Sequence, residues 1–202
     1  FSGNFGLRVV NTDVTSRGLR SGIDVINNID GTVSLVSTGT FETETFGGSS
    51  TAWLPSFNGT LALNDDTLLR VGVFRALSRP DPSALGAGRT IALAGGGSYA
   101  TVEEAISGIT ANGNPAAEPL MSWNADVSYE YYPNADSMFS GAIYYKQFTG
   151  GFVPSVVNET YEIDGNTVVV PVIVDTATSD NSDLWGIELT AAYRFSSLPA
   201  PF

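Results

Sequence analysis

Carboxylates are the only abundant side chains in this sequence that could carry out acid or base chemistry. The chain has 21 Asp and Glu residues and no His or Cys, which excludes imidazole and thiolate catalysis and makes a zinc site improbable. Glu42 and Glu44 share one face of a Thr-rich, strand-like run. Such a pair is far more often a solvated surface than a general acid and base. We therefore predict that the chain is not an enzyme.

Acidic residues near the C-terminus are the best candidates for a metal site. Asp175, Asp180 and Asp183 could offer oxygen ligands to calcium, but they lack the spacing and the glycine of a recognised calcium loop. Gly95-Gly96-Gly97 resembles a phosphate-binding loop only superficially, because no Lys-Ser or Lys-Thr pair follows it. The sequence predicts no metal and no cofactor.

The overall charge narrows the choice of partners. A net charge of −12 with only nine Lys and Arg residues argues against nucleic acid, whose phosphates must be neutralised by cations. Charged residues make up 15% of the 202 residues, against about 25% in an ordinary soluble domain. No run of 18 apolar residues occurs, so a transmembrane helix is not expected.

Strict alternation of apolar and polar residues is the main structural signal. Residues 123–131 alternate without a slip, and so does most of 185–195. Successive side chains leave a strand on opposite sides, so each run predicts a strand with one apolar and one polar face. Each run is also close to the 9 to 11 residues that a tilted strand needs to cross a bilayer. In the second run, the apolar parity carries Trp185, Ile187, Leu189, Ala191, Tyr193 and Phe195.

The connections between the predicted strands alternate between short and long. Tight turns are predicted near Asp65 and Asn134, and three insertions are predicted at about 16–50, 80–120 and 150–183. In an up-and-down sheet this order places every short turn at one edge and every long loop at the other, which is typical of outer-membrane barrels. We predict an all-β, antiparallel up-and-down transmembrane β-barrel segment, with about six membrane strands and long extracellular loops, that forms an incomplete barrel.

The insertions contain local signals of their own. Residues 16–50 include strand-like runs on either side of an Asp30-Gly31 turn, and we expect them to extend above the main sheet. Residues 80–120 suggest at most one short helix, near Thr101 to Ile109. In the third insertion, Asp164-Gly165 predicts a hairpin turn.

The polar parity of the strands predicts which side chains face the lumen. Lys or Arg on the lipid side would cost about 2 to 4 kcal/mol at mid-depth. Arg75 falls on the apolar parity and is expected to lie high on its strand, where it can snorkel to lipopolysaccharide. The residues expected to face the lumen are Arg8, Arg70, Asn124, Asp126, Glu130, Lys146, Glu188 and Arg194.

Short motifs in a fixed order resemble the barrel of TonB-dependent outer-membrane receptors. Each motif is weak alone, and the resemblance rests on their order over nearly the whole chain. In sequence order, the motifs are Gly3-Asn4-Phe5-Gly6-Leu7-Arg8, Thr12-Asp13-Val14-Thr15-Ser16, Trp53-Leu54-Pro55-Ser56-Phe57-Asn58, Asn64-Asp65-Asp66, Leu69-Arg70, Ser78-Arg79-Pro80, Asn114-Pro115 with Pro119, Glu130-Tyr131-Tyr132, Ala142-Ile143-Tyr144-Tyr145-Lys146 and Gly186-Ile187-Glu188-Leu189.

The resemblance implies a function and a set of partners. Receptors of this family have an N-terminal plug inside a barrel of about 22 strands, and they import siderophores, cobalamin or oligosaccharides with energy passed on by TonB. We find no plug, so residues 1–202 are expected to be a partial barrel domain in the outer membrane of a Gram-negative bacterium. The resemblance implies contacts with lipid and lipopolysaccharide, with a small-molecule or oligosaccharide ligand and, through the missing part of the chain, with the plug and TonB.

Ligand contact is expected from the long loops Pro80 to Leu120 and Gly150 to Asp183, and from lumen-facing residues near their bases. Tyr99, Asn112, Asn114 and Tyr161 are the candidates, because aromatic and amide groups suit siderophores and sugars; packing within the loops is the alternative role for each. Two other functions share parts of the pattern. A passive porin-like channel would have the same strands without a plug, and a soluble carbohydrate-binding β-sandwich would cover the apolar face with a second sheet.

Overall fold

The computed structural model describes residues 1–95 and 97–194, and the fold there is all-β apart from one short 3-10 helix. No helix in these residues has the length and apolarity to cross a membrane. The ten strands form one sheet in the order β10-β7-β6-β3-β2-β1-β4-β5-β9-β8. They are β1 (Ser2–Asn27), β2 (Val33–Asn64), β3 (Thr67–Ser78), β4 (Arg89–Leu93), β5 (Ile106–Ala111), β6 (Leu120–Asn134), β7 (Ser137–Thr149), β8 (Phe152–Ile163), β9 (Asn166–Ala177) and β10 (Asn181–Tyr193).

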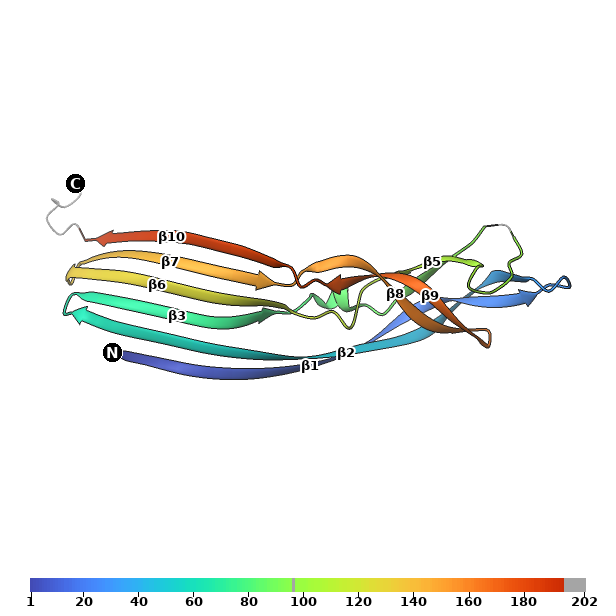
Figure 1. Cartoon of the computed structure of the whole chain (residues 1–202), viewed down its shortest axis with the longest axis horizontal. Helices are drawn as coiled ribbons and strands as arrows, with labels where there is room; N and C mark the ends of the chain where they lie inside the picture. Colours follow the sequence, from blue (N-terminus) through green and yellow to red (C-terminus); the bar gives the residue numbers. More distant parts are fainter. Residues whose placement is uncertain (96, 195–202) are drawn as a thin grey trace, which may run out of the picture.

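The six predicted membrane strands lie side by side in a long, curved sheet (Figure 1). We call this sheet the wall; it consists of β10, β7, β6 and β3, together with residues 2–15 of β1 and 51–64 of β2. All neighbours in the wall are antiparallel, as the sequence predicts. The up-and-down arrangement is therefore confirmed. Phe195, which the alternation places at the end of the last strand, lies outside the described residues.

Both predicted tight turns are present, and the same side-chain device closes each of them. The Asn64 Oδ1 accepts a hydrogen bond of 3.0 Å from the backbone N–H of Asp66. The Asn134 Oδ1 accepts one of 2.9 Å from Asp136. Asn and Asp favour turns because their short side chains bond to the backbone two residues on. The two turns lie at the same end of the wall (Figure 1).

The register of the strands separates an apolar face from a polar face. Val71, Val127, Ile143 and Ile187 form one row across four strands. Trp123, Val127, Ile187 and Leu189 are 43%, 46%, 62% and 83% exposed. No second sheet covers them in the described part of the chain, where all strands belong to one sheet. The β-sandwich alternative is therefore wrong, because it required these side chains to be buried.

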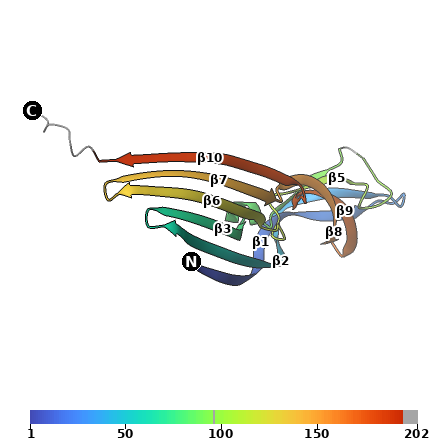
Figure 2. The same ribbon diagram turned by 60° about the vertical axis from the view of Figure 1, so that its left-hand side comes forward.

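Beyond the wall, the chain builds a second body, which we call the cap. It consists of residues 16–50 of β1 and β2 with β4, β5, β8 and β9, and Figure 2 shows it at the far end from the tight turns. The cap holds the molecule's cluster of buried apolar side chains, whereas the wall exposes its apolar face. That cluster comprises Ile23, Val102, Ile106, Ile109, Tyr161, Ile163, Val168, Val170, Val172 and Val174.

Two predicted turns shape the cap. The β1–β2 ribbon ends at Asp30-Gly31, where Gly31 has a φ of +82°. The β8–β9 hairpin turns at Asp164-Gly165, with φ of +47° and +76°, the left-handed conformation that this residue pair favours. Both turn predictions are confirmed.

The insertion 80–120 contains a single short helix among its described residues, but the position predicted for it, near Thr101 to Ile109, is wrong. Residues 106–111 form β5, paired with β4, and the helix that the structure describes in this insertion is a 3-10 turn at Pro82–Leu85. The β4–β5 register shifts between Ala92 and Leu93, which leaves Ser107 unpaired. This bulge brings Ile106 and Ile109 to the same, buried side. Two buried residues three positions apart are typical of a helix, so the spacing of Ile106 and Ile109 in the sequence resembles a helical pattern.

Candidate functional site

Seven of the eight side chains predicted to face the lumen share one face of the wall. The cross-strand pairs place them on the parity opposite to the exposed apolar side chains. These seven are Arg8, Arg70, Asn124, Asp126, Glu130, Lys146 and Glu188. The eighth, Arg194, lies just beyond the end of β10, where its backbone N–H bonds to the Asp136 carbonyl and its Nη1 lies 3.4 Å from the Asp136 Oδ1.

Some charged side chains on this polar face pair with each other. The Arg70 Nε donates to the Glu130 Oε1 at 2.9 Å, and the Arg70 Nη1 donates to the Thr60 hydroxyl at 3.2 Å. Glu130 also accepts from the hydroxyls of Tyr132, at 2.8 Å, and Ser128, at 3.3 Å. The network ties together β2, β3 and β6, so these groups support the wall.

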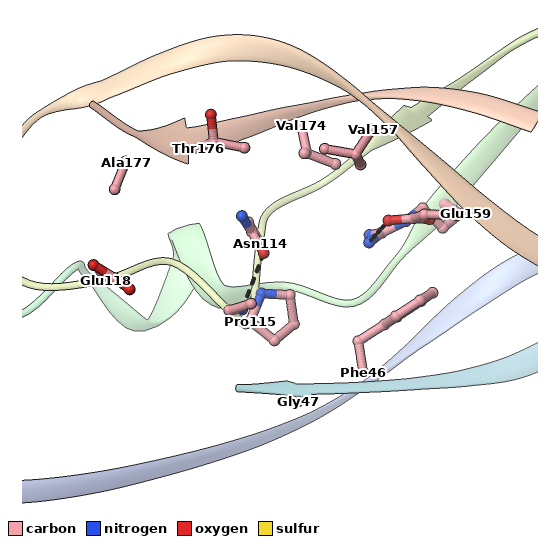
Figure 3. A pocket seen from close by; sticks show the side chains of 12 residues that line it. Phe46, Gly47, Asn114, Pro115, Glu118, Val157, Glu159, Val174, Thr176 and Ala177 are labelled. Atoms are coloured by element: carbon pink, nitrogen blue, oxygen red, sulfur yellow. Dashed lines mark hydrogen bonds and ion pairs between the residues drawn. The ribbon is translucent and has the colours of Figure 1, made fainter. Parts of the chain in front are cut away.

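The best candidate for ligand contact is a hollow of about 510 Å³ in the cap, which we call the cap hollow (Figure 3). It opens between β2, the 114–118 segment and the β8–β9 hairpin. The surface that lines the cap hollow is mostly apolar, as the surfaces of small-molecule sites commonly are. The lining residues are Phe46, Gly47, Arg89, Asn114, Pro115, Ala116, Glu118, Val157, Glu159, Val174, Thr176 and Ala177.

A buried ion pair forms one side of the cap hollow. The Arg89 Nε and Nη2 donate to the two oxygens of Glu159 at 2.8 and 2.9 Å, and the side chains are only 2% and 14% exposed. The Arg89 Nη1 bonds to the carbonyls of Gly88, at 3.0 Å, and Gly113, at 3.4 Å. The guanidinium also lies 4.3 Å from the centre of the Phe46 ring. Arg89 is therefore held by the protein on every side.

The ionisation of this pair follows from its contacts. Burial opposes the charge on Glu159, but the hydrogen bonds from Arg89 and Tyr161 and the positive charge of Arg89 outweigh it, so the pKa of Glu159 lies below its usual value. Burial and the bond to Glu159 raise the pKa of the Tyr161 hydroxyl. Glu159 is thus a carboxylate at neutral pH and Tyr161 a neutral donor.

Three further polar side chains line the cap hollow: Asn114, Glu118 and Thr176. The Asn114 Nδ2 donates to the Asp175 carbonyl at 2.8 Å, and its Oδ1 accepts from the Ala116 N–H at 3.0 Å (Figure 3). Glu118 is exposed and remains open to a ligand. Residues 1–95 and 97–194 contain no cluster of three acidic side chains that could hold a metal ion.

Comparison with known proteins identifies the family of this chain. A family profile described as "TonB dependent receptor-like, beta-barrel" matches residues 1–200. The chain belongs to this family. No curated protein matches its sequence.

Solved structures of this barrel family have the same fold. The siderophore receptor PirA from Acinetobacter baumannii is similar with a TM-score of 0.50 and 16% identity, over 94% of this chain and 26% of that one. The G324V mutant of the ferric enterobactin receptor PfeA from Pseudomonas aeruginosa gives 0.50 and 15%, over 86% and 24%. This TonB-dependent receptor barrel chain thus spans about a quarter of the length of these two receptors.

The four residues predicted to contact a ligand do not line one common site. Asn114 lines the cap hollow, whereas Asn112 borders a separate hollow of about 250 Å³. Tyr161 is 3% exposed, within the apolar cluster of the cap. Tyr99 pairs with the Val33 backbone, and its hydroxyl donates to the Gly95 carbonyl at 3.3 Å.

Sequence reasoning missed the buried arginines of the cap. Arg20 is 2% exposed, and its Nε lies 2.6 Å from the Glu44 Oε1, while Nη2 bonds to Glu42 and to the Glu162 carbonyl. Glu42 and Glu44 are therefore the partners of a buried cation; Glu42 is 48% exposed, in keeping with the predicted solvated surface, whereas Glu44 is only 24% exposed. Arg20 is the direct neighbour of Arg89 where β1 meets β4. The sequence did contain one signal of this burial: Arg20 occupies a position of the β1–β2 ribbon whose side chain faces the inside of the cap.

Proposed function

We propose that this chain forms part of the barrel wall and the extracellular loop region of an outer-membrane receptor that takes up a scarce ligand with energy from TonB. The observation that carries the proposal is the exposed apolar face of the wall. Lipid would cover side chains such as Ile187 and Leu189, which supports a wall that lies in the outer membrane of a Gram-negative bacterium, in contact with lipid and lipopolysaccharide.

The opposite face is proposed to line the lumen. Its polar side chains would meet water or a plug domain supplied by another part of the receptor, and TonB would act through that plug. The cap stands at the end of the wall away from the tight turns, which is the extracellular end in barrels of this kind. A ligand arriving from outside would therefore reach the cap hollow first, next to Asn114 and Glu118.

Siderophores, cobalamin and oligosaccharides remain the candidate ligands. The solved relatives are named as siderophore or ferric enterobactin receptors, which favours a siderophore. Asn112, Tyr99 and Tyr161 stay proposed as loop residues that shape the ligand region, the last of them from within the cap's core.

Uptake by the full-length receptor tests this proposal. We expect bacteria that express it to take up one member of a panel of ferric siderophores, cobalamin and maltodextrins, and to lose that uptake when TonB is removed. A passive porin-like channel would continue to admit the same compound without TonB. Uptake that persists in the TonB-deficient strain would therefore replace the receptor proposal with the channel.

A further inference from the structure

Three arginines line a second hollow, at a gap between two strands of the wall. Arg8 belongs to the polar face, whereas Arg75 comes from the apolar parity of β3, beside Trp123. We call this hollow the arginine hollow; it measures about 490 Å³, and Arg8, Arg75 and Arg79 line it together with Val10, Leu54, Ser56, Asn58, Phe74, Ala76 and Leu77. No Asp or Glu is among these lining residues. The chain has 21 acidic and only nine basic residues, so a third of its cations surround one hollow free of carboxylates.

The hollow forms where two strands of the wall separate. The ladder between β2 and β3 begins at the pair Ser56–Phe74 and runs toward the tight turn. On the cap side of this pair, β3 bonds only to β6 while β2 bonds only to β1. Pro55, which has no N–H to donate, lies at the point where the ladder stops. Side chains of both strand ends therefore border open space.

The three arginines lack anionic partners. In the part of the chain that the structure describes, none of them forms an ion pair, whereas Arg20, Arg70, Arg89 and Arg194 all do. The Arg79 Nη2 donates to the Thr12 hydroxyl at 3.2 Å. The Arg75 guanidinium lies 5.9 Å from the Trp123 ring, and its Nε is buried without a hydrogen-bond partner. Asp126 does not line the hollow, but it lies on the same face in the row of Asn58, and its carboxylate lies over Gly72, the residue that pairs with Asn58.

We propose that the arginine hollow binds oxyanion groups, carboxylate or phosphate, of the ligand that the receptor transports. Guanidinium groups suit these planar or tetrahedral anions because their donors form two parallel hydrogen bonds. Arg8 and Arg79 lie on the lumen side of the wall, where a ligand leaving the cap hollow would pass. The inference rests on the proposed function and narrows the ligand to an anionic compound, which disfavours neutral oligosaccharides.

Titration of the full-length receptor in detergent tests the site. We expect citrate and inorganic phosphate to bind to the wild-type receptor, more weakly as the salt concentration rises. The double variant R8Q/R79Q should bind citrate about tenfold or more weakly. The variant R8K/R79K, which keeps both charges, should lose less affinity. R17Q is the matched control, since Arg17 is an exposed arginine on the same strand that does not line the hollow.

The outcomes separate the site from the proposed function. Absence of citrate and phosphate binding in the wild type, or an equal loss in R17Q, would overturn the arginine hollow as an anion site. If the wild type binds neither anion but still takes up its ligand through TonB, only this inference fails. If anion binding follows the arginines but uptake ignores TonB, the proposed function fails, and with it the assignment of the anions to a transported ligand.

Discussion

Arg89 and Glu159 are 70 residues apart in the sequence, yet they form a two-point ion pair of 2.8 and 2.9 Å in the cap. Arg89 belongs to the insertion after β3, and Glu159 to the insertion after β7. The pair therefore strengthens the join between two loop regions that the pairing of β5 with β9 also connects. Because both side chains are largely buried, the energetics of a buried ion pair apply.

The variant Arg89→Gln should destabilise the cap. It leaves the Glu159 carboxylate buried without its cation, which typically costs about 3 to 5 kcal/mol. Hydrogen exchange of β8 and β9 in the full-length receptor measures the change, and we expect faster exchange there with little change in β6 and β7. The control is Arg194→Gln, which removes an exposed ion pair of 3.4 Å; such pairs contribute little. Equal exchange in wild type and Arg89→Gln would show that the cap does not depend on the pair.

The stability of the cap should fall in acid because of Glu159. Its pKa is lower in the folded protein than its ordinary value of 4.5, so its contribution is fully present above the ordinary value and is lost as the pH falls through the folded value. We expect proteolysis of the cap, by a protease that keeps its activity from pH 3 to pH 7, to accelerate as the pH falls across that window. Glu159→Gln cannot titrate and should be cleaved readily at every pH. A wild-type cap that resists the protease equally at pH 3 and pH 7 would contradict this.

The wall could be predicted from the sequence because its information is local. Alternation in residues 123–131 reports the two faces of a strand directly, since neighbouring side chains must point in opposite directions. The Asn64 and Asn134 turns are closed by side chains two residues from their partners. Nothing distant in the sequence has to be known for either feature.

The cap could not be predicted in the same way. Its pairings join β1 to β4 and β5 to β9 in parallel, and parallel neighbours are distant in sequence and have no turn to announce them. The bulge at Ser107 also disguises β5 as a helix. The candidate site shares this difficulty: Tyr161 was chosen for its chemistry, but only the packing of β8 reveals that it is buried, and only the fold brings Arg20 beside Arg89.

Gly18 of β1 should be required for the close contact between the β1–β2 ribbon and the segment that leads into β4. A Cβ on Gly18 would lie 2.1 Å from the backbone nitrogen of Gly88 and 2.3 Å from the carbonyl carbon of Ala87. Gly18→Ala must therefore push the backbones apart, and overpacking of this kind typically costs about 1 to 3 kcal/mol. We expect faster hydrogen exchange in β4. Gly108→Ala is the control, because a Cβ there has no atom within 4 Å. Identical exchange in the two variants would mean that the close approach at Gly18 is not required.

An introduced charge should impair assembly on one face of β10 and be tolerated on the other. Ile187 lies on the exposed apolar face, in the row of Ile143 and Val127, whereas Thr190 lies on the polar face. Arginine facing lipid near the midplane costs about 2 to 4 kcal/mol, so Ile187→Arg should lower the amount of folded receptor in the outer membrane, measured by its heat-modifiable migration in gels. Thr190→Arg places the same charge on the same strand but on the face that we propose lines the lumen, where water would solvate it, and should assemble normally. If Thr190→Arg were the damaging change and Ile187→Arg were tolerated, the faces of the wall would be assigned the wrong way round.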